Sequence, residues 1–378
     1  MSNPFKITHK DKKTQARVGK LITKKGEIVT PFFMPVATKA TVKHISTQDL
    51  YSMGAKAVIS NTFILHLRPG EKIIKKMGGI GRFMNFNGIN VTDSGGFQMY
   101  SPNCYISSND QGVFFKNPFS GEKVFITPEK DMQIQLDLGS EVAMCLDSMP
   151  LLHHSKKEIS EAVRKTTLWA GRCKSSHDKL QNKIKRKNKQ LLFGITQGGI
   201  YSGLRKESAK NLMKFDFDGY SIGGLALGET TSQEMNAIKA HKSVIPCDKV
   251  TYLMGAGNPL EILEAIGLGV DMFDSRYPTQ NARRGTIFTS SGMIKIFNKK
   301  YDNDKRPLDE NCDCFVCRNY SRAYIKYILK QGEGNGLRLA SYHNLYYMQK
   351  LIDDAKIAIK KGKFSDFKNK IKKAYKKK

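Results

Sequence analysis

The chain has 378 residues, a length that fits one large domain or two ordinary ones. Lysine and arginine total 63 against 34 acidic residues, and this net charge of +29 favours a polyanionic partner such as nucleic acid. No apolar run approaches the roughly 18 residues of a membrane-spanning helix, which argues against an integral membrane protein.

The N-terminus, MSNPFKITHKDKK, is polar and basic, so we expect no signal peptide and a cytoplasmic location. The cysteine count is odd, and three of the seven cysteines are crowded together. This pattern indicates metal ligands in a reducing compartment rather than disulfides. The cysteines are Cys104, Cys145, Cys173, Cys247, Cys312, Cys314 and Cys317.

Short apolar runs recur along the chain, and most end in small or polar residues. We expect strands in AKAVISNTF, INVTDSGG, EVAMCLD, LLFGITQGG, GYSIGGLALGE, VTYLMGAG and VDMFD. Helix-like segments lie between them. One begins at Thr127–Pro128 and stops at Gly139, and another spaces Ile159, Val163 and Leu168 at helical intervals.

This alternation predicts an α/β fold with a parallel sheet. A (β/α)8 TIM barrel is favoured over an open doubly wound sheet, because a barrel brings all the strand ends to one mouth. We also expect a small zinc-binding subdomain near the C-terminus. Residues 104–124 are interpreted as a hairpin insertion. Residues 355–378 hold eleven lysines and one acid, and we interpret them as a solvated, partly frayed helix, with docking to a phosphate backbone as the alternative.

The crowded cysteines Cys312, Cys314 and Cys317 and, farther along, His343 match the ligand set of a closed tetrahedral Zn²⁺ site. We expect a helix after Cys317, a glycine turn, and a second helix that His343 begins. All four positions are protein ligands, so the site is predicted to be structural. The alternative is three incidental cysteines near an unrelated histidine.

Three carboxylates, Asp93, Asp147 and Asp274, stand at the ends of different predicted strands. Each alone is typical of a helix cap, but convergence at one mouth would cost stability unless function retained them. A carboxylate pair can run a double displacement at an anomeric carbon, one acid attacking and the other moving protons. A third carboxylate fits the adjacent N1–H and 2-amino donors of guanine.

Other side chains near these strand ends suit a purine. The Gln197 amide and the backbone N–H groups of GGLA can donate to guanine O6, and Phe97 and Met254 can sandwich the ring. Plain core packing is the alternative for Phe97 and Met254.

Six stretches, VTDSGGFQ, GITQGG, GGLALGE, YLMGAGNP, DMFDSRYPT and CDCFVC…SYHNL, occur together and in this order. They resemble the bacterial queuine tRNA-ribosyltransferases, also called tRNA-guanine transglycosylases, over about residues 5–360. The resemblance implies a (β/α)8 barrel with an inserted zinc subdomain and a homodimer that needs no nucleotide cofactor. It divides the chain into the main part of the catalytic barrel (1–298), a zinc-binding subdomain (299–350), and a C-terminal helix with a Lys-rich tail (351–378).

The reaction implied is exchange of guanine at wobble position 34 of GUN-anticodon tRNAs for a 7-deazaguanine, usually preQ1 in bacteria. Asp274 matches the nucleophile on ribose C1′, and Asp93 matches the general acid/base. The groups that match or flank the base site are Ser94, Phe97, Asp147, Gln197, Gly224, Leu225 and Met254. Those that match stretches contacting the RNA are Gly255, Ala256, Gly257, Asn258, Pro259, Leu260, Glu261, Thr279, Gln280, Asn281, Ala282 and Arg283.

The arginines after Asp274 would hold phosphates and bases around a splayed-out nucleotide, and their field would keep Asp274 ionised. The chain departs from the family pattern at Met149 and Leu227, which we expect near the 7-substituent. Leu227 narrows that space and favours preQ1 over the bulkier queuine, while Glu229 is placed to meet an ammonium group.

In the loop after the nucleophile, Gln280 and Arg284 replace a commoner Arg and Asn, which shifts the charge along the loop. Two other functions compete with tRNA base exchange. One is a barrel glycosidase or nucleosidase for small molecules, and the other is a non-catalytic RNA-binding subunit. The second predicts a lost acid, and Asp93, Asp147 and Asp274 are all present.

Overall fold

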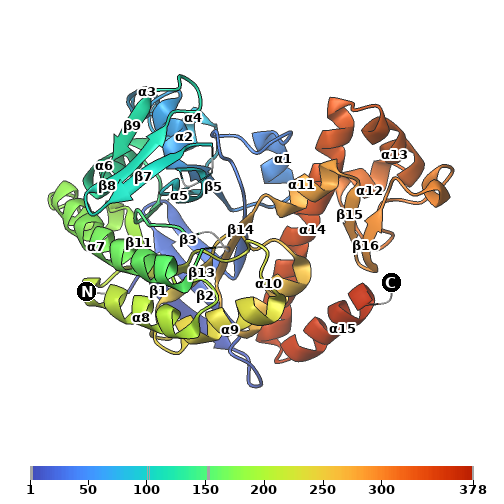
Figure 1. Ribbon diagram of the computed structural model, residues 1–378. Coiled ribbons are helices and arrows are strands. Elements are labelled where there is room, and N and C mark those ends of the chain that lie inside the picture. The colour runs from blue at the N-terminus through green and yellow to red at the C-terminus, as the bar shows by residue number, and fades with distance from the viewer. Residues whose placement is uncertain (1–2, 100, 102, 151–153, 377–378) are drawn as a thin grey trace.

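The computed structural model describes residues 3–99, 101, 103–150 and 154–376. Within these residues, eight parallel strands pair in the order β4–β14–β13–β12–β11–β10–β6–β5. The sheet closes on itself where Val36, directly after β4, forms a parallel bridge with Ile59 of β5. The predicted (β/α)8 barrel is therefore confirmed (Figure 1). The strands are β4 Phe32–Pro35, β5 Ala57–Asn61, β6 Ile89–Asp93, β10 Val142–Met144, β11 Leu191–Thr196, β12 Gly219–Ile222, β13 Val250–Leu253 and β14 Met272–Ser275.

The sequence interpretation missed strand β4. It is four residues long, follows Pro31 and ends at Pro35, and prolines demote a run as a strand candidate because they cannot donate to the ladder. All four residues are nevertheless buried, and β4 pairs with β14 in register, Phe33 opposite Phe273. The other seven barrel strands lie within the runs that were predicted.

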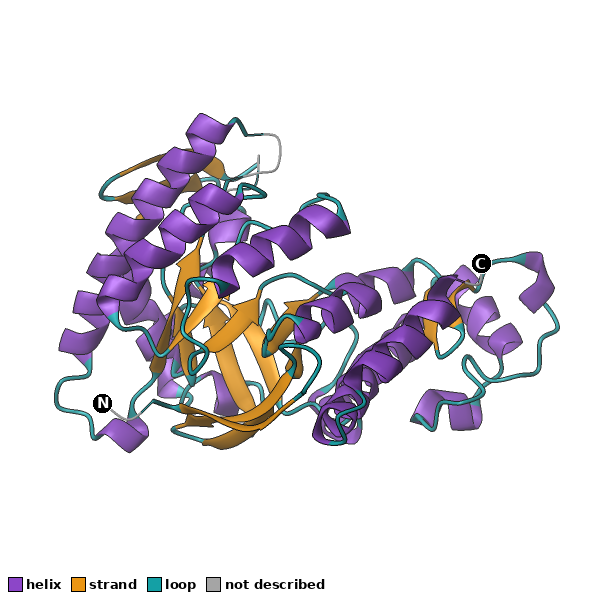
Figure 2. Cartoon of the chain, turned by 90° about the horizontal axis from the view of Figure 1, so that it is seen from below, coloured by secondary structure: helices purple, strands orange, loops and turns teal. Residues whose placement is uncertain are grey.

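Helices follow the strands and surround the barrel (Figures 1 and 2). Their ends obey local rules. Ser155 and Glu158 form a capping box at the start of α7, and Gly139 ends α6 in the left-handed conformation at φ 76°. The helices up to β14 are α1 Thr47–Ser52, α2 Thr62–Leu67, α3 Glu71–Lys76, α4 Ile80–Phe83, α5 Gly96–Met99, α6 Pro128–Leu138, α7 Lys156–Leu180, α8 Ser202–Leu212, α9 Thr231–Lys242 and α10 Pro259–Gly267.

An antiparallel sheet that the sequence interpretation did not predict closes one end of the barrel. It consists of β1 Phe5–Lys10, β2 Arg17–Thr23 and β3 Gly26–Thr30. Its residues Phe5, Leu21 and Ile28 join the buried cluster formed by the inward-facing strand residues. The barrel interior is therefore a filled core, and polar chemistry is confined to its open end.

The insertion at residues 104–124 forms the predicted hairpin, to which a further strand is added. β7 Tyr105–Asn109 pairs antiparallel with β8 Gly112–Lys116, and β8 pairs with β9 Lys123–Ile126. This small sheet packs beside α6 and α7 at the upper left of Figure 1.

After β14 the chain leaves the barrel and then returns. The excursion holds α11 Tyr277–Arg283, β15 Thr286–Thr289, β16 Gly292–Lys295, the short 3₁₀ turn Lys299–Tyr301, α12 Phe315–Asn319 and α13 Arg322–Lys330. It stands at the right of Figure 1. The chain comes back through α14, Gly334–Lys360. The prediction that His343 begins this helix was wrong, because the helix starts nine residues earlier.

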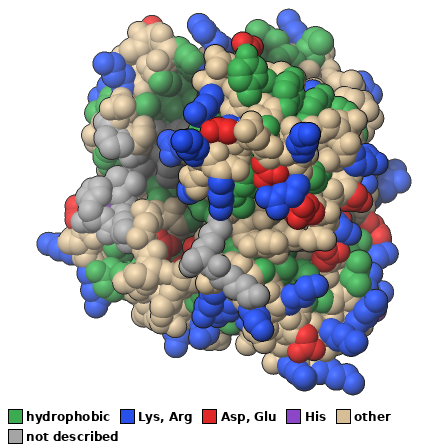
Figure 3. All heavy atoms as spheres, turned by 90° about the vertical axis from the view of Figure 1, so that its right-hand side faces the viewer, with side chains coloured by type: hydrophobic (Ala, Val, Ile, Leu, Met, Phe, Trp, Pro, Cys, Tyr) green, Lys and Arg blue, Asp and Glu red, His purple; other side chains and the backbone are tan. Residues whose placement is uncertain are grey.

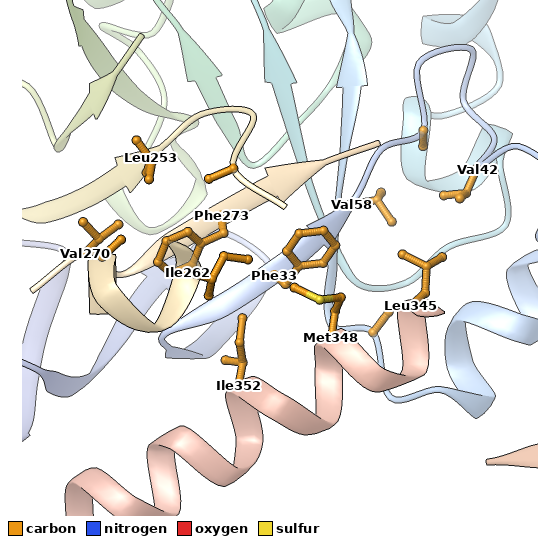
Figure 4. Close-up of a cluster of buried hydrophobic side chains, with 14 of the residues drawn as sticks. Phe33, Val42, Val58, Leu253, Ile262, Val270, Phe273, Leu345, Met348 and Ile352 are labelled. Carbon is orange, nitrogen blue, oxygen red and sulfur yellow. The ribbon is translucent and has the colours of Figure 1, made fainter. Parts of the chain in front are cut away.

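One face of α14 covers the barrel. Leu345, Met348 and Ile352 pack with Phe33 of β4 and Phe273 of β14 (Figure 4). α14 therefore serves as the barrel helix that follows β14. The expected boundary between residues 350 and 351 falls inside α14, and the division into 1–298, 299–350 and 351–378 stays a prediction.

The C-terminal helix α15, Phe364–Lys376, is docked on the molecule. Phe364 is fully buried, Lys368 contacts Glu264 of α10 at 2.7 Å, and the Tyr375 hydroxyl donates to that of Tyr347 at 3.0 Å. The interpretation of a solvated, frayed helix was wrong, because apolar residues at positions 364, 367, 371 and 375 form one continuous face. None of the helices in the described part of the chain is long and apolar enough to cross a membrane.

Candidate active site

One cavity of about 450 Å³ opens at the carboxyl ends of the barrel strands. Asp93 at the end of β6, Asp147 beyond β10 and Asp274 on β14 all line it. The barrel thus brings together three carboxylates that are separated by more than fifty residues from one to the next. This is the convergence on which the sequence interpretation depended.

Asp274 accepts hydrogen bonds from two donors, one on β13 and one in the turn after it. The Tyr252 hydroxyl donates to Oδ1 at 2.5 Å, and the Gly255 N–H donates to the same oxygen at 3.0 Å. Burial raises the pKa of Asp274, and these two hydrogen bonds oppose the rise. The sequence interpretation expected the arginines after Asp274 to favour its ionised form, but no arginine is among the groups that shift its pKa, and the two opposing hydrogen bonds come from Tyr252 and Gly255.

Asp93 has a different environment. Asn61 of β5 donates its amide to both carboxylate oxygens, at 2.9 and 3.1 Å, and the Gly95 N–H donates at 3.0 Å. Burial and, secondarily, the nearby charge of Asp274 raise the pKa of Asp93 to about 7 despite these donors. Asp93 can therefore release and accept a proton near neutral pH.

Asp147 is buried against the floor of the cavity. It accepts hydrogen bonds from the Ser94 hydroxyl at 3.0 Å and from Nε2 of Gln197 at 2.6 Å. Burial raises the pKa of Asp147 to about 6. The Gln197 Oε1 atom is buried beside Gly224 without a hydrogen-bond partner among the described residues, so the Gln197 amide retains an unused acceptor.

The loop after β12 completes this wall. Gly224 adopts φ 64°, and a Cβ there would lie 2.4 Å from Gln197 Oε1, so the position requires glycine. Farther along, the Glu229 carboxylate accepts the N–H groups of Ala226 at 2.6 Å and Leu227 at 2.9 Å. This acid therefore fixes the shape of the loop from within.

The predicted site residues fall into two groups. Besides the three carboxylates, those that line the cavity are Ser94, Gly224, Leu225, Met254, Gly255, Gly257, Asn258, Glu261 and Gln280. Gln197 stands directly behind, against Asp147 and Gly224. The side chain of Phe97 lies outside the described residues. The expected positions near 7-substituents, Met149 and Leu227, are both in the cavity wall.

Several predicted RNA-contacting residues lie behind the cavity wall instead. Ala256, Thr279 and Ala282 are buried, and Pro259 is buried in the first turn of α10. Leu260, Asn281 and Arg283 are partly exposed and do not line the cavity. In this chain, residues of these two stretches can approach a ligand mainly through Gly255, Asn258, Glu261 and Gln280.

Two polar residues of the site were not assigned a role from the sequence. Tyr252 was missed, although it lies on β13 two residues before Met254, which directly follows the strand and lines the same cavity. Asn61 was noticed at a strand end, but its contact with Asp93 depends on the pairing of β5 with β6, which the sequence did not specify.

The cysteine–histidine group lies apart from this cavity, beside α14. The sulfur atoms of Cys312, Cys314 and Cys317 approach His343 Nδ1 at 4.0, 3.5 and 3.3 Å, and all four ligand atoms lie within 4.8 Å of one another. His343 Nε2 is 2.8 Å from the Phe288 carbonyl. That contact makes Nε2 the protonated nitrogen and leaves the Nδ1 lone pair for a metal ion. The group can hold a metal ion.

The chain matches the family model described as queuine tRNA-ribosyltransferase over residues 11–377. It is 45% identical to the queuine tRNA-ribosyltransferase of Bacillus licheniformis over 356 residues, 94% of this chain and 92% of that protein. It is 44% identical to the protein of the same name from Fusobacterium nucleatum, over 98% of each chain. The identity to the protein of that name from Staphylococcus haemolyticus is 45%, over 95% of this chain and 93% of that one.

The chain belongs to the queuine tRNA-ribosyltransferase family. The predicted resemblance is therefore confirmed, and with it the class of enzyme, a pentosyltransferase of the tRNA-guanine transglycosylase type. A non-catalytic subunit would lack one of the acids, and the cavity holds all three.

Proposed function

We propose that this enzyme replaces guanine at wobble position 34 of GUN-anticodon tRNAs with a 7-deazaguanine, through a covalent bond between Asp274 and ribose C1′. The observation that supports this most directly is the unequal environment of two acids in one cavity. Burial raises the pKa of both acids, but the charge of Asp274 adds to the rise at Asp93, which reaches about 7, and no such contribution from Asp93 raises the pKa of Asp274. One acid is thus suited to attack and the other to proton transfer.

In the first half of the reaction, a carboxylate oxygen of Asp274 forms a bond to C1′ as the C1′–N9 bond of the target guanosine breaks. The electron pair of that bond stays on the base, and protonated Asp93 supplies the proton that neutralises it. In the second half, Asp93 takes the proton from the incoming base. That base then attacks C1′, and Asp274 leaves as a carboxylate. The exchange needs no external energy source.

Base recognition rests on the wall opposite the nucleophile. Asp147 offers two acceptor oxygens for the N1–H and 2-amino donors of guanine. Gln197 uses one Nε2 hydrogen toward Asp147 and has a second, and the loop at Gly224 and Leu225 adds backbone donors for O6. Ser94 and Met254 complete the wall, and Phe97 is proposed as a stacking partner.

We propose preQ1 as the incoming base and queuine as the alternative. Leu227 and Met149 occupy the wall where a 7-substituent would lie, and Glu229, Glu234 and Glu261 line the same cavity. Burial and the charges of its two neighbours raise the pKa of Glu234 to about 8, so a small cationic substituent such as an aminomethyl group would relieve the repulsion among these acids.

We propose Zn²⁺ as the ion held by Cys312, Cys314, Cys317 and His343. Three thiolates and one imidazole are a donor set typical of structural zinc, and four protein ligands leave no open position. Bound zinc would tie the excursion after β14 to α14, which carries His343.

The proposed macromolecular partner is the anticodon stem-loop of tRNA. Lysine and arginine side chains spread over the side of the molecule that carries the excursion, and acidic ones are fewer (Figure 3). The outward residues Lys370, Lys373 and Lys376 of α15 are exposed and are proposed as phosphate contacts. A homodimer and a cytoplasmic location are proposed from family membership. The exposed Tyr324 and Tyr327 are candidates for the dimer interface.

The experiment that tests this function incubates the purified protein with tRNA(Tyr) and labelled guanine, and then with preQ1 or queuine as competitor. Incorporation of label into tRNA, blocked more strongly by preQ1 than by queuine, is expected. Hydrolysis of small nucleosides without incorporation into tRNA would instead support the nucleosidase alternative. Stronger competition by queuine would keep the reaction and overturn the choice of base.

A further inference from the structure

Arg205 on α8 is a fully buried arginine, and no ion pair joins it to a carboxylate of the described residues. Its guanidinium donates to backbone carbonyls instead. Nε reaches Gly199 at 2.8 Å, Nη1 reaches Thr196 at 2.9 Å, and Nη2 reaches Gly224 at 3.4 Å. Burial without a close counter-charge lowers the pKa of Arg205 to about 9. Burying a cation without an ion-pair partner costs free energy, so we expect Arg205 to have a function.

The three carbonyls lie at the ends of two neighbouring barrel strands and in the loops that follow them. Thr196 ends β11 and Gly224 follows β12, so Arg205 joins the two loops that carry the proposed base-binding residues. One turn later on α8, the Ser208 hydroxyl accepts the N–H of Gln197 at 3.0 Å. α8 therefore sets the positions of both the Gln197 and the Gly224 segments from outside the barrel.

The contact with Gly224 decides how the next peptide is turned. In a trans peptide the C=O and the N–H point in opposite directions. Because the Gly224 carbonyl faces Arg205, the N–H of Leu225 faces away from it. Gly224 and Leu225 both line the cavity, and neither N–H donates to an acceptor within the described residues.

The rest of the loop shows a contrasting pattern. The next two N–H groups, of Ala226 and Leu227, are both taken by the Glu229 carboxylate. The loop is thus anchored on one side by a cation at a carbonyl and on the other by an anion at two N–H groups. Unpaired backbone donors at a buried wall call for a ligand acceptor.

We propose that Arg205 is a positioning residue of the base site. It fixes the Gly224–Leu225 segment with its unpaired N–H groups at the cavity, and its buried charge strengthens them as donors to the oxygen at position 6 of the base. The inference rests on the proposed base exchange. When the C1′–N9 bond breaks, the base keeps the electron pair and the 6-oxygen shares the negative charge, which a fixed cation one peptide away favours.

The test compares guanine with 6-thioguanine, whose sulfur is a weak acceptor. For wild-type, Arg205→Met and Arg205→Lys proteins, guanine incorporation into tRNA gives kcat and KM, and competition gives the inhibition constant of 6-thioguanine. Arg205→Met should lower kcat/KM for guanine by about 10- to 100-fold, less than the loss of a complete oxyanion donor. It should also shrink the preference for guanine over 6-thioguanine severalfold. Arg205→Lys keeps an amino group but loses the planar guanidinium with its several donors. Its kcat/KM and its guanine preference should lie between those of the wild type and Arg205→Met.

The matched control is Arg17→Met. Arg17 is also a buried arginine that donates to a backbone carbonyl, but it pairs with Asp271, directly before β14, and lies at the closed end of the barrel. Arg17→Met should lower the melting temperature without changing the preference for guanine over 6-thioguanine. An unchanged ratio in Arg205→Met overturns the proposal, as does an equal change in Arg17→Met. If Arg205→Met does not fold, an unchanged ratio in Arg205→Lys overturns it. Absence of guanine incorporation by the wild-type protein would instead overturn the proposed function itself.

Discussion

The carboxylate cavity and the cysteine–histidine group both gather ionisable side chains from distant parts of the chain, yet their ligands are used in opposite ways. In the cysteine–histidine group all four ligand atoms face one point, within 4.8 Å of one another. In the cavity, Asp93 and Asp147 face a space of about 450 Å³ with their pKa values raised to about 7 and 6.

The difference separates a site built for holding from a site built for reaction. A single metal ion would bind all four ligand atoms of the cysteine–histidine group, and its binding would stabilise the folded state. Burial disfavours the charged forms of the cavity acids, and their hydrogen bonds do not fully compensate. Acids in such an environment are typical of sites where they take part in a reaction. Four experiments examine this contrast.

The largest effect is expected at Asp274. Asp274→Ala should abolish the covalent RNA–protein adduct, because it removes the carboxylate proposed to bond C1′, while Asp93 and Asp147 stay bound to their own donors, Asn61 and Gln197. Denaturing gel electrophoresis after incubation with tRNA measures the adduct. Retention of an adduct by this variant would refute the assignment of the nucleophile, and wild-type-like tRNA binding would show that the fold survives.

The metal group should respond through stability. The protein is expected to contain about one zinc per chain, and Cys317→Ser should lose the metal and several kcal/mol of unfolding free energy. Metal content by mass spectrometry and a denaturant titration check this. Cys247→Ser, an exposed cysteine outside the group, is the control. Folded wild-type protein without zinc would remove the claim.

Replacing Asp147 should change stability in the opposite direction to replacing Cys317. Its folded pKa of about 6 lies above the ordinary value of 3.8, so the folded state binds more protons between these values. The unfolding free energy contributed by this group therefore falls as pH rises from about 4 to 6 and stays low above that range. Asp147→Asn should stabilise the protein at pH 8 by about 1–3 kcal/mol and give little gain at pH 4.

Denaturant titrations at the two pH values measure this difference, while affinity for guanine should fall. Glu207→Gln, at an exposed position on α8, is the control and should change stability little at either pH. A loss of stability in Asp147→Asn at pH 8 would mean that the acid is retained for the fold rather than for the base.

The smallest effect concerns α15. Deleting residues 372–378 would also remove Tyr375, which contacts Tyr347, so substitution is the cleaner test. Changing Lys370, Lys373 and Lys376 to glutamine should weaken tRNA binding severalfold at low salt, with the difference fading as salt rises. The same change at Lys206, Lys210 and Lys214, on and just after α8, is the control. Equal effects of the two triple variants would show that only net charge matters.

Much of the barrel was predictable because seven of its strands are apolar runs that end in small or polar residues. β4 was not, since its prolines hide a buried strand that only the closure of the sheet explains. α15 was misjudged for a related reason. It lies within residues 355–378, whose eleven lysines suggest a solvated segment, and its apolar face is explained only by packing against α10, α14 and β16.

The site shows the same limit. The strand-end acids could be predicted because each follows an apolar run, but the difference between the environments of Asp93 and Asp274 could not. Burial and the charge of Asp274 outweigh the Asn61 hydrogen bond at Asp93, and at Asp274 the hydrogen bonds from Tyr252 and Gly255 oppose the effect of burial. These neighbours meet the acids only in the folded barrel. The buried positions of Ala256, Thr279 and Ala282 were likewise hidden, because a motif records which residues recur and not which of them face solvent.

The long helix α14 links the two sites mechanically. His343 faces the metal ligands, and its neighbour Asn344 donates to the carbonyls of Pro278 and Thr286 and accepts the N–H of Phe288. Pro278 stands four residues after Asp274. Removing the proposed zinc ion with a chelator should therefore loosen the segment next to the nucleophile, and turnover should decline before the barrel itself melts.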